Sequence, residues 1–316
     1  MKFMLLLYRG EEFDPNFYYH SKVDIDHSFL LIKDQKILFV PKMNESLAKS
    51  QFKGKIVVYH DPIKELSKYI YRKRVQMDFS SISAALLSRL EVLCNPVDVS
   101  LKLLRERAKK TSPEVSSIKK AAALTREIFE SLDFKSAKTE LDIEKQLKIM
   151  TVEMGLESAF DPIVATDSST AFPHYKARKK KIGNLVMVDY GVRYKHYCSD
   201  LTRCFILDGN KKKKEQYENL QNLFYSIVDE IPNLKTGGAL AKLSEKKLEK
   251  FGFPKLIHSI GHGVGLDVHE LPNLRLKSKD PLSGTVLAIE PAFYLKQYGM
   301  RFEETIFYDG KKVRVL

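Results

Sequence analysis

The chain has 316 residues, of which 44% are hydrophobic and 29% are charged. This composition is typical of a folded protein, and the length predicts a small domain followed by a larger one. No window approaches the roughly 18 uncharged residues that a membrane-spanning helix needs. The short apolar run at the N-terminus meets Arg9, Glu11 and Glu12 before a signal-peptide pattern is complete. We therefore expect a cytoplasmic protein that does not associate with a membrane.

The formal net charge of +13 concentrates in basic runs at residues 176–181 and 211–214. Both runs lie beside turn-forming residues and belong to no nucleic-acid motif, so we interpret them as solvated loops and expect no nucleic-acid partner. The three cysteines, Cys94, Cys198 and Cys204, lack CxxC spacing. They predict buried free thiols in a reducing compartment and no disulfide framework.

In the first part of the chain, apolar runs alternate with helix-like stretches. Strands are expected at residues 3–8, 29–32, 36–40 and 55–59, and a helix at residues 82–93. This pattern predicts a small α/β domain over residues 1–110. His20, Asp24, Asp26 and His27 lie close in sequence, but no regular element gathers them on one face, so a metal site there is disfavoured.

The second part of the chain begins with helix signals. Thr111, Ser112 and Pro113 supply a cap and a helix-starting proline. Apolar spacing predicts one helix after this point and a second at residues 140–154, which Gly155 would end. Strands and glycine-rich loops follow, so we predict an α+β protein whose second domain covers residues 111–316.

A hairpin-like segment at residues 185–203 carries the first pair of acids. An apolar run ends at Asp189, a polar bend follows, and a second strand contains Asp200. If the bend centres on Tyr194 and Lys195, the two acids become cross-strand neighbours on one face.

A second segment, at residues 286–307, repeats this arrangement. A bend near Lys296 and Gln297 would oppose Glu290 and Glu303. Burying four close carboxylates without compensation would cost many kcal/mol, whereas two divalent cations supply the matching charge. Each acid alone has an ordinary interpretation as a cap or a strand-edge charge, but their joint occurrence favours a dinuclear metal centre.

A histidine-rich segment lies between the two hairpins. His258 and His262 have the spacing of two ligands on a helix, but Gly261, Gly263 and Gly265 make a regular helix there unfavourable. We expect a tight loop that presents separate histidines. One imidazole beside four carboxylates suits manganese, cobalt or zinc, and two such ions would acidify a water between them into a nucleophile.

Five motifs, VDYG, SDLTR, HSIGHGVGLDVHE, AIEP and RFEE, occur in this order between Ser112 and Leu316. With them the sequence resembles the Xaa-Pro peptidases, the family of prolidase and aminopeptidase P, which shares a pita-bread catalytic fold with methionine aminopeptidase and creatinase. Residues 14–19 resemble the family's N-terminal domain more loosely. The resemblance implies an N-terminal domain of the creatinase/prolidase type and a pita-bread catalytic domain.

The resemblance also implies five metal ligands that hold two divalent ions per chain, either manganese or cobalt, with zinc as the alternative. These ligands are Asp189, Asp200, His262, Glu290 and Glu303. Asp200 and Glu303 would bridge the ions, Asp189 would complete one site, and His262 with Glu290 would complete the other.

Further residues take catalytic or substrate-binding roles by the same resemblance. Glu290 would act as general acid/base, His174 would lie near the scissile bond, and His269 would hold the substrate carbonyl. His258 and Arg301 would support the substrate or the ligands.

The implied activity is hydrolysis of the bond between an N-terminal residue and a following proline, by a homodimer that acts on peptides. Residues 266–270, LDVHE, and the domain ahead of the catalytic one favour the proline-specific branch. The alternatives are a methionine-type or broader aminopeptidase, and a non-catalytic peptide- or histone-binding protein, which the complete ligand set disfavours. Residues 165–170 and Cys204 depart from the family pattern without removing a ligand.

Overall fold

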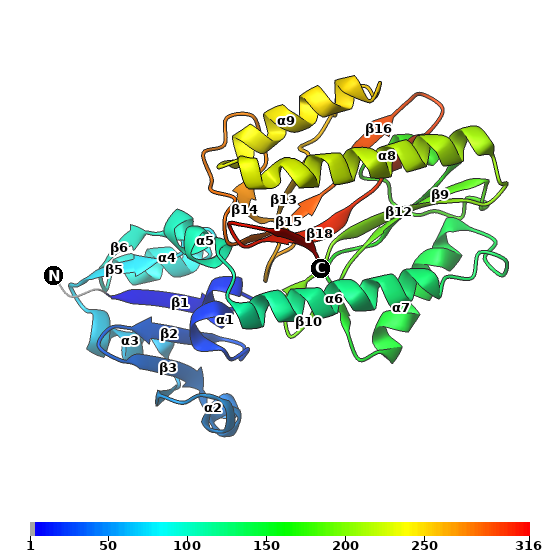
Figure 1. The fold of residues 1–316 in the computed structure, drawn as a ribbon. Helices are drawn as coiled ribbons and strands as arrows, with labels where there is room; N and C mark the ends of the chain where they lie inside the picture. Colours follow the sequence, from blue (N-terminus) through cyan, green and yellow to red (C-terminus); the bar gives the residue numbers. More distant parts are fainter. Residues whose placement is uncertain (1–3) are drawn as a thin grey trace. The chain divides into compact units, whose positions relative to one another are not determined.

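The computed structural model describes residues 4–316, which form two compact units that divide between Arg107 and Ala108 (Figure 1). This division comes three residues before the domain boundary expected at residue 110. The first expected strand begins at Phe3, outside the described residues, and is seen from Leu5 onward. Among the described helices, none is long and apolar enough to cross a bilayer.

The first unit is built on one mixed six-stranded sheet. In spatial order its strands are β4 (Lys55–Tyr59), β3 (Lys36–Pro41), β2 (Ser28–Ile32), β1 (Leu5–Arg9), β5 (Arg74–Met77) and β6 (Asn95–Asp98). Its helices are α1 (Pro15–Ser21), α2 (Glu45–Gln51), α3 (Pro62–Ile70), α4 (Ala84–Glu91) and α5 (Ser100–Ala108). The expected strands are confirmed, and the helix expected at 82–93 is shorter because Ser83 caps its start. Asp24 and Asp26 pair with Arg9, which gives these acids a structural partner.

The second unit combines four helices with small antiparallel sheets. Its helices are α6 (Ser112–Glu130), α7 (Glu140–Glu153), α8 (Lys211–Glu230) and α9 (Gly237–Lys250). The strands that precede α9 are β7 (Glu157–Ser158), β8 (Ile163–Thr166), β9 (Leu185–Tyr190), β10 (Val192–Tyr194), β11 (Tyr197–Cys198) and β12 (Leu201–Ile206). Those that follow it are β13 (Gly261–Gly263), β14 (Glu270–Asn273), β15 (Thr285–Ile289), β16 (Ala292–Tyr294), β17 (Gly299–Arg301), β18 (Glu304–Tyr308) and β19 (Val313–Val315).

Two of these sheets carry the candidate site. One has the order β12-β9-β8 and the other the order β14-β13-β15-β18-β19, and a bridge between Thr202 and Glu303 joins them. Figure 1 shows β9, β12, β13, β15 and β18 between the pair α8 and α9 and the pair α6 and α7. Every residue of β9 is buried, because the strand is covered on both faces.

The helices of the second unit begin where the sequence places capping residues. Thr111 and Glu114 form a capping box at the start of α6, and Thr139 and Asp142 form another at α7. Gly155 follows α7 with a φ of 67°, a conformation that glycine adopts without strain. Both expected helices are therefore confirmed.

The lysine run at residues 211–214 is not a loop, so that expectation was wrong. These residues form the first turn of α8, where the side chain of Asn210 accepts the Lys213 N–H. The buried stripe of α8 includes Leu220, Phe224 and Ile227, and it packs in one core with β9 and β15 residues. That apolar packing outweighs the unfavourable position of lysines at a helix N-terminus. The three cysteines are buried and free, as expected.

The first acid-bearing hairpin has a register different from the expected one. Lys195 and His196 occupy the turn with φ values of 50° and 67°, so the bend centres one residue later than predicted. Asp189 consequently pairs with Thr202, and the expected pairing with Asp200 is wrong. Because the offset is two residues, Asp200 stays on the same face as Thr202 and remains a diagonal neighbour of Asp189.

The second acid-bearing hairpin has the expected register. Ala292 pairs with Arg301 and Tyr294 with Gly299 at its tip, while Ile289 pairs with Glu304 at its base. Glu290 and Glu303 lie between these pairs and therefore oppose each other, as predicted.

Candidate metal centre

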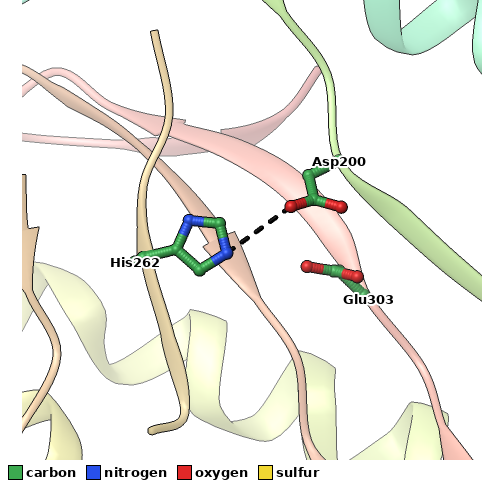
Figure 2. Close-up of side chains that lie close together, drawn as sticks. All are labelled: Asp200, His262 and Glu303. Atoms are coloured by element: carbon green, nitrogen blue, oxygen red, sulfur yellow. Dashed lines mark ion pairs between the residues drawn. The ribbon is translucent and has the colours of Figure 1, made fainter. Parts of the chain in front are cut away.

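Three side chains from three separate segments converge in the second unit. Asp200 precedes β12, His262 lies in β13 and Glu303 precedes β18, and their ligand atoms all lie within 4.8 Å of one another. Figure 2 shows the three side chains directed toward one point, with His262 Nε2 3.5 Å from Asp200 Oδ2. Two carboxylates and an imidazole in this arrangement form a candidate site for a divalent cation.

His262 reaches this point because glycines flank it in a crowded strand. A Cβ atom at Gly261 would lie 1.9 Å from the Ala288 carbonyl oxygen, and one at Gly263 would lie 2.1 Å from the Leu271 oxygen. Only glycine therefore allows β13 to lie between β14 and β15. The sequence predicted a loop here, and that was wrong for His262, although the absence of a helix is confirmed.

Asp189 and Glu303 are linked through Arg301 and Thr202. The Arg301 guanidinium donates to Asp189 Oδ2 and, through Nε at 3.0 Å, to the Thr202 hydroxyl. Thr202 in turn donates to Glu303 Oε2 at 2.6 Å. All four side chains are buried, so this network fixes two acidic groups in orientation.

Glu290 and His258 lie on another side of the cluster. His258 Nδ1 is 3.6 Å from Glu290 Oε2, and His258 Nε2 is 3.0 Å from the Tyr294 hydroxyl. Arg301 Nη1 donates to the same hydroxyl at 3.0 Å. Arg301 therefore connects Glu290's neighbours with Asp189.

His174 and His269 are the exposed members of the predicted set. The His269 ring lies edge-on to His262, with 4.3 Å between ring centroids. His174 lies in the loop after the 3₁₀ turn at Asp167–Ala171, within electrostatic range of Asp189, His258 and His269. The structure thus gathers the nine predicted residues around one centre, with three in direct cluster contact and His174 at its margin.

The acidic groups lie in an environment that disfavours their charge. Burial raises the pKa of Asp200 and Glu303 well above their usual ranges, and neighbouring carboxylates raise both further. Burial likewise raises the pKa of Glu290 to about 8. Burial lowers the pKa of His258 and of His262 to about 4, which keeps both imidazoles neutral at physiological pH.

The side-chain oxygens of this cluster fit a cation. Oδ1 of Asp189 and Oδ1 of Asp200 are buried, and within the described residues neither has a hydrogen-bond partner. A buried acceptor without a donor is costly, and a divalent ion would satisfy both oxygens while it offsets the mutual repulsion of the carboxylates. A neutral His262 imidazole is also the form that binds metal.

Comparison with known proteins identifies the family. Residues 116–309, more than half of the chain, match metallopeptidase family M24. The chain belongs to this family. M24 peptidases bind divalent metal, which agrees with the donor set described above.

Relatives of this M24 peptidase match nearly all of its length. An uncharacterized peptidase from Methanocaldococcus jannaschii is 30% identical over 308 residues, which cover 91% of this chain and 84% of that protein. The Xaa-Pro dipeptidase of Pyrococcus furiosus is 28% identical over 309 residues, 92% of this chain and 87% of that protein. The crystal structure of X-Pro aminopeptidase from Thermotoga maritima superposes with a TM-score of 0.88 at 23% identity and covers 99% of this chain and 95% of that one. The predicted α+β fold with a pita-bread domain is thus confirmed.

Two residues of the M24 centre were missed from the sequence. Thr202 and Tyr294 each make the hydrogen bonds described above. Thr202 comes two residues after Asp200, and Tyr294 comes four after Glu290. The two-residue period of a strand would have placed both on the faces of the acids they accompany.

Proposed function

We propose that this M24 peptidase hydrolyses the bond between an N-terminal residue and a following proline, as a dipeptidase or an aminopeptidase. The observation that carries the proposal is the cluster of Asp200, His262 and Glu303 in a chain 28% identical over 309 residues to an Xaa-Pro dipeptidase. Membership of a peptidase family argues against the non-catalytic binding protein considered above.

Five residues would hold two divalent ions in this proposal, with manganese or cobalt expected and zinc as the alternative. They are Asp189, Asp200, His262, Glu290 and Glu303. The ions would supply an acidified water for attack on the peptide carbonyl and Lewis-acid stabilisation of the charge that develops there. The partnerless oxygens of Asp189 and Asp200 support this assignment.

Glu290 is the acidic side chain that would exchange a proton with substrate. Its side chain is 15% exposed, whereas that of Asp200 is 6% exposed. We assign it the general acid/base role, because a proton carrier must reach the reacting groups. His258 lies beside it and would orient the carboxylate, and the Tyr294 hydroxyl contacts the other ring nitrogen of His258.

His269 and His174 would act on the substrate from the exposed side of the centre. The His269 ring, in contact with His262, would donate to the carbonyl oxygen as its negative charge grows. His174 would contact the peptide near the scissile bond. Arg301 would keep its structural role, since the Asp189 carboxylate and Thr202 and Tyr294 hydroxyls occupy its donors.

The first unit would serve as an N-terminal domain of the creatinase/prolidase type. The match to the Pyrococcus furiosus relative, which covers 92% of this chain, supports this role. We further propose a homodimer, which follows from the family resemblance, and a cytoplasmic location, which three free buried thiols support.

The test is peptide hydrolysis by protein stripped of metal and resupplied separately with manganese, cobalt or zinc. Ala-Pro and Ala-Pro-Ala are the substrates, and Ala-Ala-Ala and Met-Ala-Ser are the controls. We expect metal-dependent cleavage of the proline peptides alone, and their rate ratio then distinguishes a dipeptidase from an aminopeptidase. Faster cleavage of Met-Ala-Ser would replace the proposal with a methionine-type aminopeptidase, and no cleavage with any metal would overturn it.

A further inference from the structure

A buried glutamate outside the metal centre joins the two ends of the segment that carries His174. Glu140, the first residue of α7, is fully buried. Its Oε1 accepts the backbone N–H of Thr166 at 3.0 Å, and its Oε2 accepts the N–H of Arg178 at 3.1 Å. One carboxylate therefore binds the chain eight residues before His174 and four residues after it.

Other hydrogen bonds also join the two ends of this segment, an arrangement that we call the closure. The Glu140 N–H donates to the Lys180 carbonyl at 3.0 Å, and the Lys180 ammonium donates to the Thr166 carbonyl, also at 3.0 Å. Near the middle of the segment, the Thr170 hydroxyl accepts the N–H of Gly299 at 2.9 Å. Gly299 opens β17, the strand that ends at Arg301, so the segment is also tied to the hairpin of the metal centre.

The closure matters because the segment has little regular structure of its own. After the 3₁₀ turn that ends at Ala171, residues 172–180 belong to no helix or strand, and His174 is exposed. A loop of this kind is positioned by the points at which it is fastened. A carboxylate with two acceptor oxygens satisfies both N–H groups, whereas an amide in its place offers one acceptor and turns a donor toward the other N–H.

We infer that Glu140 is a positioning residue that sets the place of His174 relative to the metal centre. This inference rests on the proposed function, in which His174 contacts the peptide near the scissile bond. Glu140 itself touches neither the metal centre nor substrate, so its effect on catalysis passes through His174.

The first test compares Glu140→Gln with Asp142→Asn. Asp142 lies on the same helical turn and also accepts backbone N–H groups, those of Lys138 and Thr139, but it does not bind the His174 segment. We expect Glu140→Gln to lower kcat for Ala-Pro-Ala about 10- to 100-fold, as loss of a supporting hydrogen bond does at comparable sites. KM and metal content should change little, and the Tm should stay close to that of Asp142→Asn. Equal kcat in the two variants would overturn the inference.

A double-mutant cycle with His174→Ala separates positioning from general damage. Because Glu140 acts through His174, adding Glu140→Gln to His174→Ala should lower kcat by no more than about twofold further. Independent losses that multiply would mean that Glu140 supports the enzyme in some other way.

Limited trypsin digestion tests the same inference without reference to activity. The segment offers exposed cleavage points at Lys176, Arg178 and Lys179. We expect faster cleavage there in Glu140→Gln than in the parent chain, and no acceleration in Asp142→Asn. An unchanged rate would overturn the inference even in a protein with no proline-peptidase activity, whereas loosening in a protein without that activity would refute the proposed function alone.

Should Glu140→Gln fail to fold, Lys180→Met gives the test from the other side of the closure. Lys180 is only partly buried, and its ammonium binds Thr166 and Ser169. Faster cleavage at Lys176 in this variant, with kcat lowered, supports the inference, and unchanged cleavage contradicts it.

Discussion

Glu303 and Glu304 are adjacent in the chain, yet their carboxylates lie in opposite environments. Glu304 accepts hydrogen bonds from Arg203 and from Arg126, the latter at 2.6 Å. Glu303 faces the acidic cluster, where the hydroxyl of Thr202 donates to it. Successive side chains of an extended segment point to opposite faces. One face therefore holds a paired carboxylate, and the other holds like charges that burial drives toward protonation.

The difference separates carboxylates that have a cationic partner from carboxylates that repel one another. A buried acid with a cationic partner stabilises the fold as long as both partners are present. Buried acids that repel one another are retained where something else supplies the positive charge, and such strongly shifted groups cluster at functional sites. Glu270, paired with Lys110 at 2.9 Å, belongs with Glu304, and Asp200 belongs with Glu303.

The largest expected effect comes from comparing Glu303→Gln with Glu304→Gln. Glu303→Gln removes a proposed metal ligand, and losing several kcal/mol of metal-derived stabilisation should slow hydrolysis about 10³-fold or more. Glu304→Gln should keep activity within about tenfold, because it leaves the cluster intact. Steady-state rates on Ala-Pro and metal content measure both. Similar losses in the two variants would contradict the division between the two faces.

The same two variants should shift stability in opposite directions when metal is chelated. Glu303→Gln removes a carboxyl group whose ionisation is disfavoured by burial and by neighbouring carboxylates, and should stabilise the protein by about 1 kcal/mol. Glu304→Gln weakens two partly exposed ion pairs and should destabilise it by about 2 kcal/mol. Chemical denaturation in the presence of chelator measures both shifts.

Lys110→Met sharpens the comparison at the buried pair with Glu270. Both side chains are nearly inaccessible, at 2% and 1%, so the change removes the cation that pairs with a buried carboxylate. We expect a loss of about 3–5 kcal/mol in the free energy of unfolding. Lys148→Met is the matched control, because its pair with Glu144 is exposed and should contribute less than about 1 kcal/mol. Equal losses would show that burial does not strengthen this pair.

Stability of the metal-free protein should fall as the pH rises from about 7 to 9. The folded pKa of Glu290 is about 8, whereas the unfolded group titrates near 4.5. The folded state therefore holds a proton in this window that the unfolded state does not, and that stabilisation is lost as the pH passes through 8. His258 and His262, with pKa values lowered to about 4, affect stability below about pH 6.5, which is outside the range from pH 7 to 9.

For Glu290 alone, the expected loss of stability from pH 7 to 9 is about 1.4 kcal/mol, because its folded pKa lies one unit above pH 7. Thermal unfolding across this range measures it. Glu290→Gln should flatten the profile, and saturating manganese should do so too, because a bound cation keeps the carboxylates ionised throughout. A profile that is unchanged by both would mean that these acids are not the titrating groups.

The sequence specified the second acidic hairpin better than the first for a physical reason. In both hairpins, the position of the bend between the two acids decides which face of the sheet each side chain occupies. Lys195 and His196 adopt positive φ without the glycine or asparagine that usually marks such a turn, so the first register was misjudged by two residues. The offset is even, and this is why the acids still share a face.

The positions of acids could be inferred from the sequence, but the cations that pair with them could not. Glu304 has partners 178 and 101 residues away in the chain, Glu270 has one 160 residues away, and no local spacing connects them. Glu140 escaped notice for the same reason, because its partners become neighbours only when the chain closes around α7. Within the site, the four acids lie in or directly beside strands, where the period of two indicates the face that each side chain occupies.

The smallest expected effect is that of Tyr294→Phe, which removes the hydroxyl that lies between Arg301 and His258. That hydroxyl accepts from Arg301 at 3.0 Å and contacts His258 Nε2 at 3.0 Å, while the ring keeps its packing in the variant. Arg301 retains Asp189 and Thr202, so we expect a loss of about 1 kcal/mol in stability and less than about tenfold in kcat/KM. Thermal unfolding and Ala-Pro hydrolysis measure the two.

Tyr308→Phe is the matched control for this change, because the Tyr308 hydroxyl donates to the Pro232 carbonyl at 3.4 Å and contacts none of the site residues. It should leave kcat/KM unchanged. If Tyr294→Phe behaves in the same way, Arg301 holds Asp189 without help from the hydroxyl, and the guanidinium alone is then the cationic group that sets Asp189 apart from Asp200 and Glu303. If it lowers kcat/KM instead, the orientation of His258 and Glu290 depends on the hydrogen bonds that run from Asp189 through Arg301 and Tyr294. The paired and unpaired acids of the centre then act as one unit.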